Sequence, residues 1–227
     1  MKNPLKDNLS VSLGAAAMLA PVPAVLLSCK GTEENAKPNL ITIAWTGTVC
    51  SHPPMVSVSI RPDRFSHALV EKSGCFCLNL VSWEMCRAAD FCGVRSGREM
   101  DKFLETGLHP LYFNGFPAPV VAEAPAALLC RVKQRIPLGS HDLFLAEIED
   151  VRVSPALMDE EGKLQISRAN LVAYAHGEYY PLRNHPVGFF GYSVAREDVL
   201  EKRMGKSAGK ERQEQKPKEN KERRRRG

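Results

Sequence analysis

No stretch of about 20 uninterrupted apolar residues occurs in the 227-residue sequence, and a helix needs such a stretch to cross a bilayer, so a multispan membrane protein is excluded. The composition is also without strong bias. Hydrophobic residues make up 44% and charged residues 25% of the chain, which excludes collagen-like structure and pervasive disorder. The length suits one large domain or two small ones. A chain of this length buries roughly 70% of the surface that its unfolded form exposes, so its fold needs no metal or disulfide for stability.

The sequence also lacks the spacings of metal sites and of disulfide frameworks. Its seven cysteines are odd in number and include no CxxC pair, and its six histidines show no spacing typical of zinc ligands. We therefore predict no metal site, and we expect free, mostly buried thiols in a reducing, cytoplasmic environment. No Ser-His-Asp or paired-carboxylate arrangement and no GxGxxG segment is present.

Positive charge is concentrated at the C-terminal end. Residues 201–227 hold twelve Lys or Arg and five Glu, whereas the whole chain carries a net charge of +5. Residues 1–200 therefore carry a net charge of −2, which argues against a nucleic-acid enzyme, because such enzymes carry their basic patch on the folded domain. We predict a folded domain over residues 1–196 and a basic, disordered tail over residues 197–227, since the tail has too few apolar side chains to offset the entropy cost of ordering.

The N-terminal region resembles a secretion signal. An apolar run over 9–28 follows Lys2 and Lys6 and ends in Leu-Leu-Ser-Cys, as in a lipoprotein leader. Pro21 and Pro23 interrupt this run, and residues 22–29 have the pattern of a β-strand followed by a turn. We therefore expect this segment to be part of the fold.

Short segments with β-branched, aromatic or alternating residues predict most of the fold. The expected strands cover 22–29, 39–46, 55–61, 75–81, 127–136, 142–153 and 171–175. The expected helices are brief and cover 64–72, 84–91 and 101–105, with a glycine-bearing loop over 92–97. Many strands at short spacing with brief helices indicate a mainly β protein, a β-barrel with short helices.

One part of the chain combines small, hydroxyl and basic residues. The segment NLITIAWTGTVCSHPP (39–54) runs from a strand into small hydroxyl residues, which permit close approach of a phosphate or a flat heterocycle. Arg61, Arg64 and Ser66 follow at the start of an expected helix and form a candidate phosphate clamp. Arg61 at a strand end can equally be a solvated surface residue, and Ser66 can be an N-cap.

Seven motifs in a fixed order resemble the flavin reductase-like, FMN-binding split-barrel family, and most closely its flavoredoxin branch. They are PVPAVLLSC (21–29), KPNLITIAWTGTVCSHPP (37–54), VSVSIRPDRFSHALVEKSGCFCLNL (56–80), DFCGVRSGREMDKF (90–103), LLCRV (128–132), GSHDLFLAEIEDV (139–151) and YYPLRNHPVGFFGYS (179–193). The resemblance covers about residues 15–195 and implies a homodimeric split barrel that binds FMN noncovalently near the subunit interface.

The resemblance also implies roles for individual residues. Those expected to line the flavin are Thr46, Gly47, Thr48, Val49 and Ser51. Those expected near the ring edge, the ribityl chain and the phosphate are Ile60, Arg61, Ser66 and His67. Asn79 is expected to hydrogen-bond the flavin, Lys102 to add positive charge near the phosphate, and His141 to lie near the nicotinamide or substrate as the catalytic candidate.

Each of these roles has a structural alternative. Asn79 can cap a strand end, His67 can lie on a helix surface, and His141 can serve a turn carbonyl. Lys102 can be a surface lysine paired with a neighbouring carboxylate. Cys50 is at most part of the pocket lining, because no helix N-terminus or cationic group is securely placed beside it.

The function implied by the resemblance is an FMN-dependent oxidoreductase. Such a protein passes electrons from NAD(P)H or a reduced protein to free flavin, ferric iron or a redox partner. Two other classes stay open. One is a protein that binds nucleic acid or another anionic surface through the basic tail, although the Glu residues in the tail weaken this reading. The other is a cofactor-free barrel that acts as a binding module. No membrane partner is expected.

Overall fold

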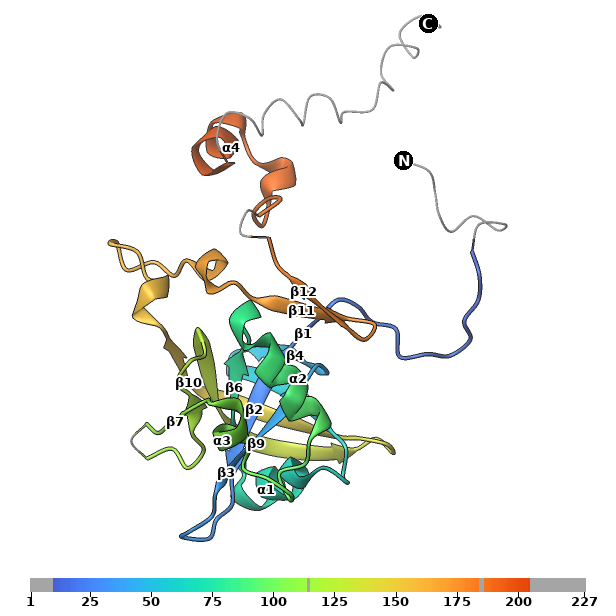
Figure 1. Cartoon of the computed structure of the whole chain (residues 1–227). Coiled ribbons are helices and arrows are strands. Elements are labelled where there is room, and N and C mark those ends of the chain that lie inside the picture. Colours follow the sequence, from blue (N-terminus) through green and yellow to red (C-terminus); the bar gives the residue numbers. More distant parts are fainter. Residues whose placement is uncertain (1–9, 114, 184–185, 205–227) are drawn as a thin grey trace, which may run out of the picture. The chain divides into compact units, whose positions relative to one another are not determined.

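The computed structural model describes residues 10–113, 115–183 and 186–204 (Figure 1). The chain divides into two compact units between residues 184 and 185, and each unit is described by itself. The second unit contains the 3-10 helix η4 (Tyr192–Val194) and helix α4 (Glu197–Met204). The first eight residues of the predicted tail are thus helical rather than disordered, and the rest of the tail lies outside the described residues. The predicted domain boundary between residues 196 and 197 stays a prediction.

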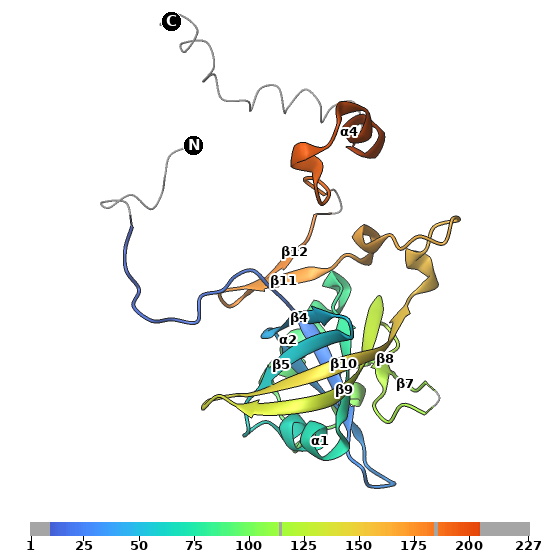
Figure 2. The same cartoon turned by 180° about the vertical axis from the view of Figure 1, so that it is seen from behind.

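The first unit is built around a seven-stranded antiparallel sheet with the order β3-β2-β6-β9-β10-β5-β4. Its strands, in chain order, are β2 (Val25–Lys30), β3 (Pro38–Ile43), β4 (Thr46–Ser51), β5 (Pro54–Ile60), β6 (Cys75–Leu80), β9 (Ala126–Pro137) and β10 (Asp142–Val153). Strands β9 and β10 form a long central hairpin, which Figure 2 shows beside β5. Two register shifts within this hairpin increase the local twist, as β-bulges do.

The sheet curls because its two edge strands are consecutive in the sequence. Strand β3 ends at Ile43 and β4 begins at Thr46, so Ala44 and Trp45 alone connect opposite edges of the sheet. Strand β3 consequently comes back to β5, and the backbone N–H of Ser59 donates to the carbonyl of Trp45 at 2.9 Å. The sheet is therefore a barrel with an incomplete seam between β3 and β5.

The remaining strands form two small sheets. A three-stranded sheet has the order β1-β11-β12 and contains β1 (Val22–Pro23), β11 (Val172–Ala175) and β12 (Glu178–Pro181). The pair β7 (Pro110–Leu111) and β8 (Val120–Val121) forms the other. Only Ala24 separates β1 from β2, so one continuous segment belongs first to the small sheet and then to the barrel.

Short helices cover the barrel. They are α1 (Phe65–Ser73), the 3-10 turn η1 (Trp83–Met85), α2 (Cys86–Val94), α3 (Lys102–Thr106), and the 3-10 turns η2 (Pro155–Leu157) and η3 (Ile166–Ala169). Helices α2 and α3 pack on β3, and α1 packs on β2 and β3 (Figure 1). In the ranges that the structure describes, no helix has the length and apolarity needed to cross a bilayer.

The core consists of three clusters of buried side chains. The largest fills the barrel interior and includes Leu27, Val58, Phe76 and Phe144. A second lies under α2 and α3, and a third lies between the outer face of β6 and the segment that leads into β8. Strand β6 is covered on both faces, which explains why CFCLNL is a nearly continuous apolar run rather than an alternating one.

The predicted mainly β fold with short helices is confirmed, and most predicted strands are present within a residue or two. Two segments differ. The strand predicted over 39–46 ends at Ile43, and Thr46 instead begins edge strand β4, which was not predicted. The prediction that the second helix ends at Phe91 is wrong, because α2 continues through Gly93 to Val94. A β-carbon at Gly93 would lie 3.4 Å from the side chain of Thr42, so α2 packs directly against β3 at this residue.

Candidate functional site

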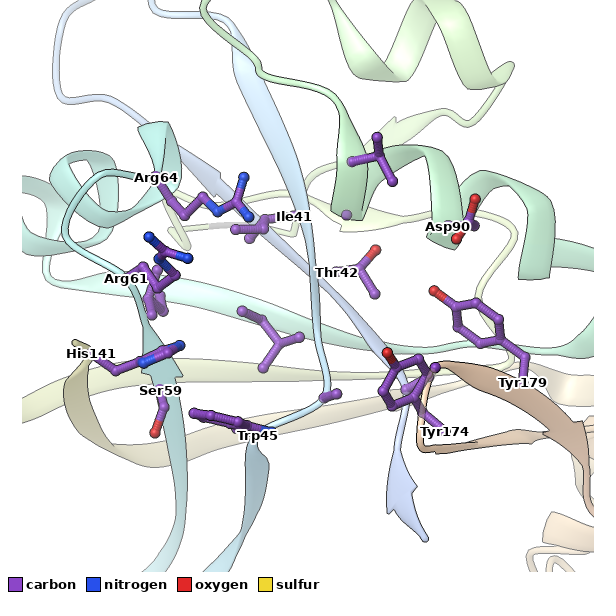
Figure 3. Close-up of a pocket in the computed structure, with 17 residues that line it drawn as sticks. Ile41, Thr42, Trp45, Ser59, Arg61, Arg64, Asp90, His141, Tyr174 and Tyr179 are labelled. Carbon is purple, nitrogen blue, oxygen red and sulfur yellow. The ribbon is translucent and has the colours of Figure 1, made fainter. Parts of the chain in front are cut away.

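A cavity of about 600 Å³ opens at the incomplete seam of the barrel (Figure 3). This volume lies within the roughly 300–1,000 Å³ range of small-molecule sites. One wall comes from β3 and the residues after it, and a second from the end of β5 and the residues after it. The remaining walls come from α2 and from the β11–β12 hairpin. The lining residues are Ala24, Ile41, Thr42, Ile43, Ala44, Trp45, Ser59, Ile60, Arg61, Arg64, Asp90, Gly93, Val94, His141, Tyr174, Gly177 and Tyr179.

An imidazole and an indole lie together at one wall. The rings of His141 and Trp45 have centroids 4.6 Å apart and planes tilted by 37° (Figure 3). Partial burial lowers the pKa of His141 below its usual 6.5, and the nearby cation Arg61 lowers it further. The imidazole is therefore neutral at physiological pH. A neutral imidazole can both donate and accept a hydrogen bond, which suits a group at the edge of a reacting molecule.

Two guanidinium groups lie beside this wall. Arg61 follows the last residue of β5 and forms an ion pair of 3.1 Å with Asp63. Arg64 immediately precedes α1, and among the described residues its side chain has no carboxylate partner within ion-pair distance. The positive charge of Arg64 is thus available to an anionic ligand.

The far wall has the opposite character. Tyr174 of β11 and Tyr179 of β12 meet edge to face with centroids 5.3 Å apart, and Asp90 of α2 faces them (Figure 3). Burial and the neighbouring Asp90 carboxylate raise the pKa of Tyr179 to about 12. The cavity therefore has a cationic end and an end with phenol and carboxylate groups.

A second cavity of about 200 Å³ adjoins the first, since both are lined by Ile41, Arg64 and Gly93. Its lining is rich in cations and small polar groups. The residues of this kind are Asn39, Arg64, Ser66, Arg95, Ser96, Arg98 and Lys102, with Asp63 as the one acidic member of the lining. The loop after α2 lies close to Asn39, and only a glycine permits this, because a β-carbon at Gly97 would lie 2.0 Å from the Asn39 side chain.

Lys102 is the buried cation of this second cavity. Its ammonium group donates to the carbonyls of Leu40 at 2.8 Å and Cys92 at 2.7 Å. Since an ammonium has three donors, one is left for a ligand. Burial lowers the pKa of Lys102, and a bound anion would offset this effect by favouring the charged form. Beside it, Asn39 holds Ser66 in place by donating to its hydroxyl at 2.7 Å.

Five of the sequence-predicted residues line these cavities. Ile60, Arg61 and His141 line the larger one, and Ser66 and Lys102 line the smaller one. Arg64, which belonged to the candidate phosphate clamp, lines both. The structure thus brings together residues from the end of β5, the start of α1, α3 and the β9–β10 turn.

The predicted residues of β4 line neither cavity. The Thr46 hydroxyl donates to the carbonyl of Ser57 at 2.7 Å, within the sheet. The others, Gly47, Thr48, Val49 and Ser51, are exposed on the edge strand. Their contact with a flavin stays a prediction, and within one copy of the chain they do not face the cavities.

His67 and Asn79 are buried and also lie outside both cavity linings. His67 is hydrogen-bonded to Asp142 at 2.8 Å rather than lying on a helix surface. The Asn79 amide donates to the Leu26 carbonyl and the Ser28 hydroxyl, and its oxygen accepts from the backbone N–H of Val121. Both side chains are occupied by the fold, so any contact with a ligand needs a rearrangement.

Sequence reasoning missed the aromatic wall and two arginines. Tyr174 and Tyr179 flank the turn His176–Gly177 in a short hairpin, and this aromatic-turn-aromatic pattern could have indicated them. Arg95 and Arg98 lie in a segment read only as a glycine-bearing loop. No signal in the sequence places Asp90 opposite His141.

Comparisons with known proteins agree with this architecture. The family described as flavin reductase like domain matches residues 18–183. The solved structure of flavoredoxin of Desulfovibrio vulgaris (Miyazaki F) is similar with a TM-score of 0.74 and 30% identity, covering 81% of this chain and 99% of that one. It confirms the expected split-barrel fold.

Curated relatives match over shorter segments. An uncharacterized protein of Aeropyrum pernix is 32% identical over 135 residues, 59% of this chain and 50% of its own length. The reductase component of a 4-nitrophenol 4-monooxygenase/4-nitrocatechol 2-monooxygenase of Rhodococcus opacus is 29% identical over 111 residues, 49% of this chain and 56% of its own length. The chain thus spans about half the length of these two relatives.

Proposed function

The chain belongs to the flavin reductase-like family, and from this premise we propose that it is an oxidoreductase that binds FMN across the two adjoining cavities. The larger cavity suits a flat heterocycle, because its walls are apolar strands and aromatic rings. The smaller cavity suits a phosphate, because four cationic side chains and two serines converge there. The observation that carries the proposal is the connection of these two kinds of cavity through Arg64.

The donor set of the smaller cavity fits a phosphate monoester better than it fits a neutral group. Lys102 is buried with one donor left, and Arg64 lacks a carboxylate partner among the described residues. Burying the Lys102 ammonium without an anion costs free energy, and a dianionic phosphate compensates this cost, while the exposed Arg64 adds a second cation beside it. Ser66, at the second residue of α1, adds a neutral donor.

When bound, FMN supplies the two-electron redox chemistry. The residues of this chain bind and orient it. Arg64 and Lys102 hold the phosphate end, and the walls formed by Ile41 and Ile60 exclude water from one side of the larger cavity. His141, kept neutral, is placed to donate or accept a hydrogen bond at the rim.

We further propose a cytoplasmic homodimer that receives electrons from NAD(P)H or a reduced protein and passes them to free flavin, ferric iron or a redox partner. The similarity to the reductase component of Rhodococcus opacus and to a flavoredoxin supports a role in electron transfer. Two large apolar side chains are exposed at this edge, Trp45 directly before β4 and Val49 within it, and they support a second copy there. In such a dimer the second copy would lie opposite the residues of β4 that the sequence predicts to line the flavin.

Binding of FMN and of riboflavin tests the proposal. FMN is expected to bind much more tightly than riboflavin, which lacks the phosphate. Arg64→Ala and Lys102→Met should each weaken FMN binding about 10- to 100-fold, the loss expected for a hydrogen bond to a charged group, and should leave riboflavin affinity unchanged. Calorimetric titration of the flavin-free protein measures both affinities.

Lys133→Ala is the matched control, because Lys133 pairs with Glu147 at 2.8 Å away from both cavities. A protein that binds neither flavin would overturn the proposal and favour the cofactor-free binding module.

Stopped-flow mixing of the FMN-loaded protein with NADH and NADPH then separates the two donor classes. Reduction by either nucleotide identifies a reductase, and reduction by neither identifies a carrier between proteins. The nucleic-acid alternative depends on the tail, most of which lies outside the described residues.

A further inference from the structure

A buried hydrogen bond between His67 and Asp142 lies beside the cavities, and neither residue lines them. His67 Nε2 is 2.8 Å from a carboxylate oxygen of Asp142, and both side chains are more than nine-tenths buried. Because a carboxylate only accepts, Nε2 carries the proton of this hydrogen bond. Arg135 approaches the same carboxylate oxygen at 3.5 Å and also pairs with Glu71.

The four side chains connect two parts of the fold. His67 and Glu71 lie one turn apart on α1, Arg135 lies near the end of β9, and Asp142 is the first residue of β10. Asp142 is also paired in register with Ile60 of β5. The network therefore fixes the tip of the β9–β10 hairpin against α1 and the end of β5.

His141 precedes Asp142 directly and belongs to the turn of that hairpin. Its carbonyl accepts from the backbone N–H of Leu138 at 2.9 Å. Because His141 is bonded directly to Asp142, fixing the buried Asp142 side chain also fixes the backbone from which the His141 side chain extends. The His141 imidazole meets Trp45 at the wall of the larger cavity (Figure 3).

Stability alone does not account for a hydrogen-bonded polar pair at this place. The desolvation of buried polar and charged groups often exceeds the attraction between them, and an apolar pair of similar volume is frequently as stable. Buried polar pairs are best attested where they fix one arrangement among several. The arrangement fixed here is the position of the hairpin tip.

We propose that His67 and Asp142 are positioning residues that hold His141 against Trp45 at the wall of the larger cavity. The catalytic meaning of that position rests on the proposed function, but the position itself does not. The role also replaces the contact with cofactor that the sequence suggested for His67.

Fluorescence of Trp45 in the flavin-free protein tests the position directly. The chain has two tryptophans, and Trp83 is exposed, so a Trp83→Phe background leaves Trp45 as the sole indole. A protonated imidazole in contact with an indole quenches its emission. The emission should therefore titrate with a midpoint below 6.5, since burial and Arg61 lower the pKa of His141. His141→Gln in this background assigns the titration by abolishing it.

The test variants are His67→Gln, Asp142→Asn and the apolar double variant His67→Phe/Asp142→Leu. In each we expect the amplitude to fall at least twofold and the midpoint to move up toward 6.5, because a released His141 becomes hydrated. The direction is diagnostic. Loss of a neighbouring carboxylate would by its field alone lower the pKa of His141, while Arg61, Arg64 and Asp63, the charges that act on His141, are unchanged in these variants.

A kinetic readout separates this proposal from the proposed function. In the FMN-loaded protein, the variants should slow reduction of the cofactor about tenfold and retain FMN affinity, because Arg64 and Lys102 are intact. A protein that never binds FMN would overturn the proposed function and leave the fluorescence result standing. A folded double variant with the parent's amplitude and midpoint would overturn the positioning role. If no variant folds, by far-ultraviolet circular dichroism, the pair serves the fold itself, and the positioning role is equally overturned.

Discussion

The buried side chain of Asn79 makes three hydrogen bonds, and all three join strands. Its amide nitrogen donates to the Leu26 carbonyl at 2.8 Å and the Ser28 hydroxyl at 2.9 Å, and its oxygen accepts from the Val121 N–H at 2.8 Å. These bonds connect β6 to β2 and β8. A polar group with full hydrogen bonding inside a core specifies the arrangement around it, because every partner loses a bond when the group is removed.

Replacing Asn79 by leucine, which has a similar volume, should therefore cost about 2–4 kcal/mol of unfolding free energy, since buried backbone groups lose their partners. Urea unfolding monitored by circular dichroism measures this loss as a lower midpoint at constant slope. Asn35→Leu is the control, because Asn35 is exposed in the turn before β3, and its effect should be within about 0.5 kcal/mol. A stable Asn79→Leu protein with weakened FMN binding would instead support the cofactor contact implied by the sequence.

Single residues were predictable where their chemistry leaves few choices. Arg61, Arg64 and Ser66 could be grouped from their spacing at a strand-to-helix junction, and the structure places all three at the cavities. Asn79 and His67 were not separable from ligand contacts by sequence, because burial decides between the two uses of an amide or imidazole. Burial depends on pairings as distant as Asn79 with Val121 and His67 with Asp142.

At the scale of elements, the ends of the helices follow local rules. Helix α1 ends at Gly74 with φ of 66°, and α3 ends at Gly107 with φ of 67°. The Gly74 N–H donates to the Val70 carbonyl at 2.9 Å and completes the helix. Glycine adopts this left-handed conformation without the steric cost that a β-carbon brings.

Gly74→Ala should destabilise the protein by about 1–2 kcal/mol, the cost of a left-handed conformation for a residue with a β-carbon. Nothing lies within 4 Å of a β-carbon at this position, so the loss would reflect the backbone and not a clash. Thermal unfolding of Gly74→Ala beside Gly47→Ala makes the comparison. A β-carbon at Gly47 would also meet nothing within 4 Å, but Gly47 does not have a positive φ. Its substitution should therefore be neutral or slightly stabilising. Equal effects at the two positions would contradict this account of the helix end.

Strands were predictable where alternation and turns coincide. Residues 142–153 were expected as a strand and form β10 with those bounds. Strand β4 was not expected, since Thr-Gly-Thr-Val-Cys-Ser is a pattern typical of loops, and its strand conformation depends on pairing with β5 across the turn at His52–Pro53. The Gly93 position in α2 similarly depends on contact with Thr42, which propensity cannot reveal.

At the scale of the molecule, five of the seven cysteines are buried and distributed over all three core clusters. Cys29 and Cys130 lie in the barrel interior, Cys92 lies under the helices, and Cys75 and Cys77 lie in the third cluster. Burial raises the pKa of Cys29 and Cys130 to about 12 and that of Cys92 to about 11. Thiolate formation is therefore suppressed while the protein is folded.

A disulfide-exchange reagent should thus react promptly only with the two partly exposed thiols, Cys50 and Cys86. The five buried thiols should react together in a slow phase that accelerates with urea, because they become accessible when the whole unit opens. Mass spectrometry of the modified protein counts the thiols, and all seven should react in denaturant. Earlier labelling of Cys92 than of Cys29 would show that the cluster under the helices opens independently.

The order of strands in the large sheet has a consequence for synthesis on the ribosome. Strands β5 and β6 lie on either side of the β9–β10 hairpin, although residues 54–80 are translated well before residues 126–153. The emerging chain must therefore carry two unmatched strand edges for the time needed to add more than forty residues, and exposed edges of this kind attract other chains. Tyr174 and Tyr179 arrive later still. A nascent chain that has not reached Tyr179 consequently has no complete cavity to offer a ligand.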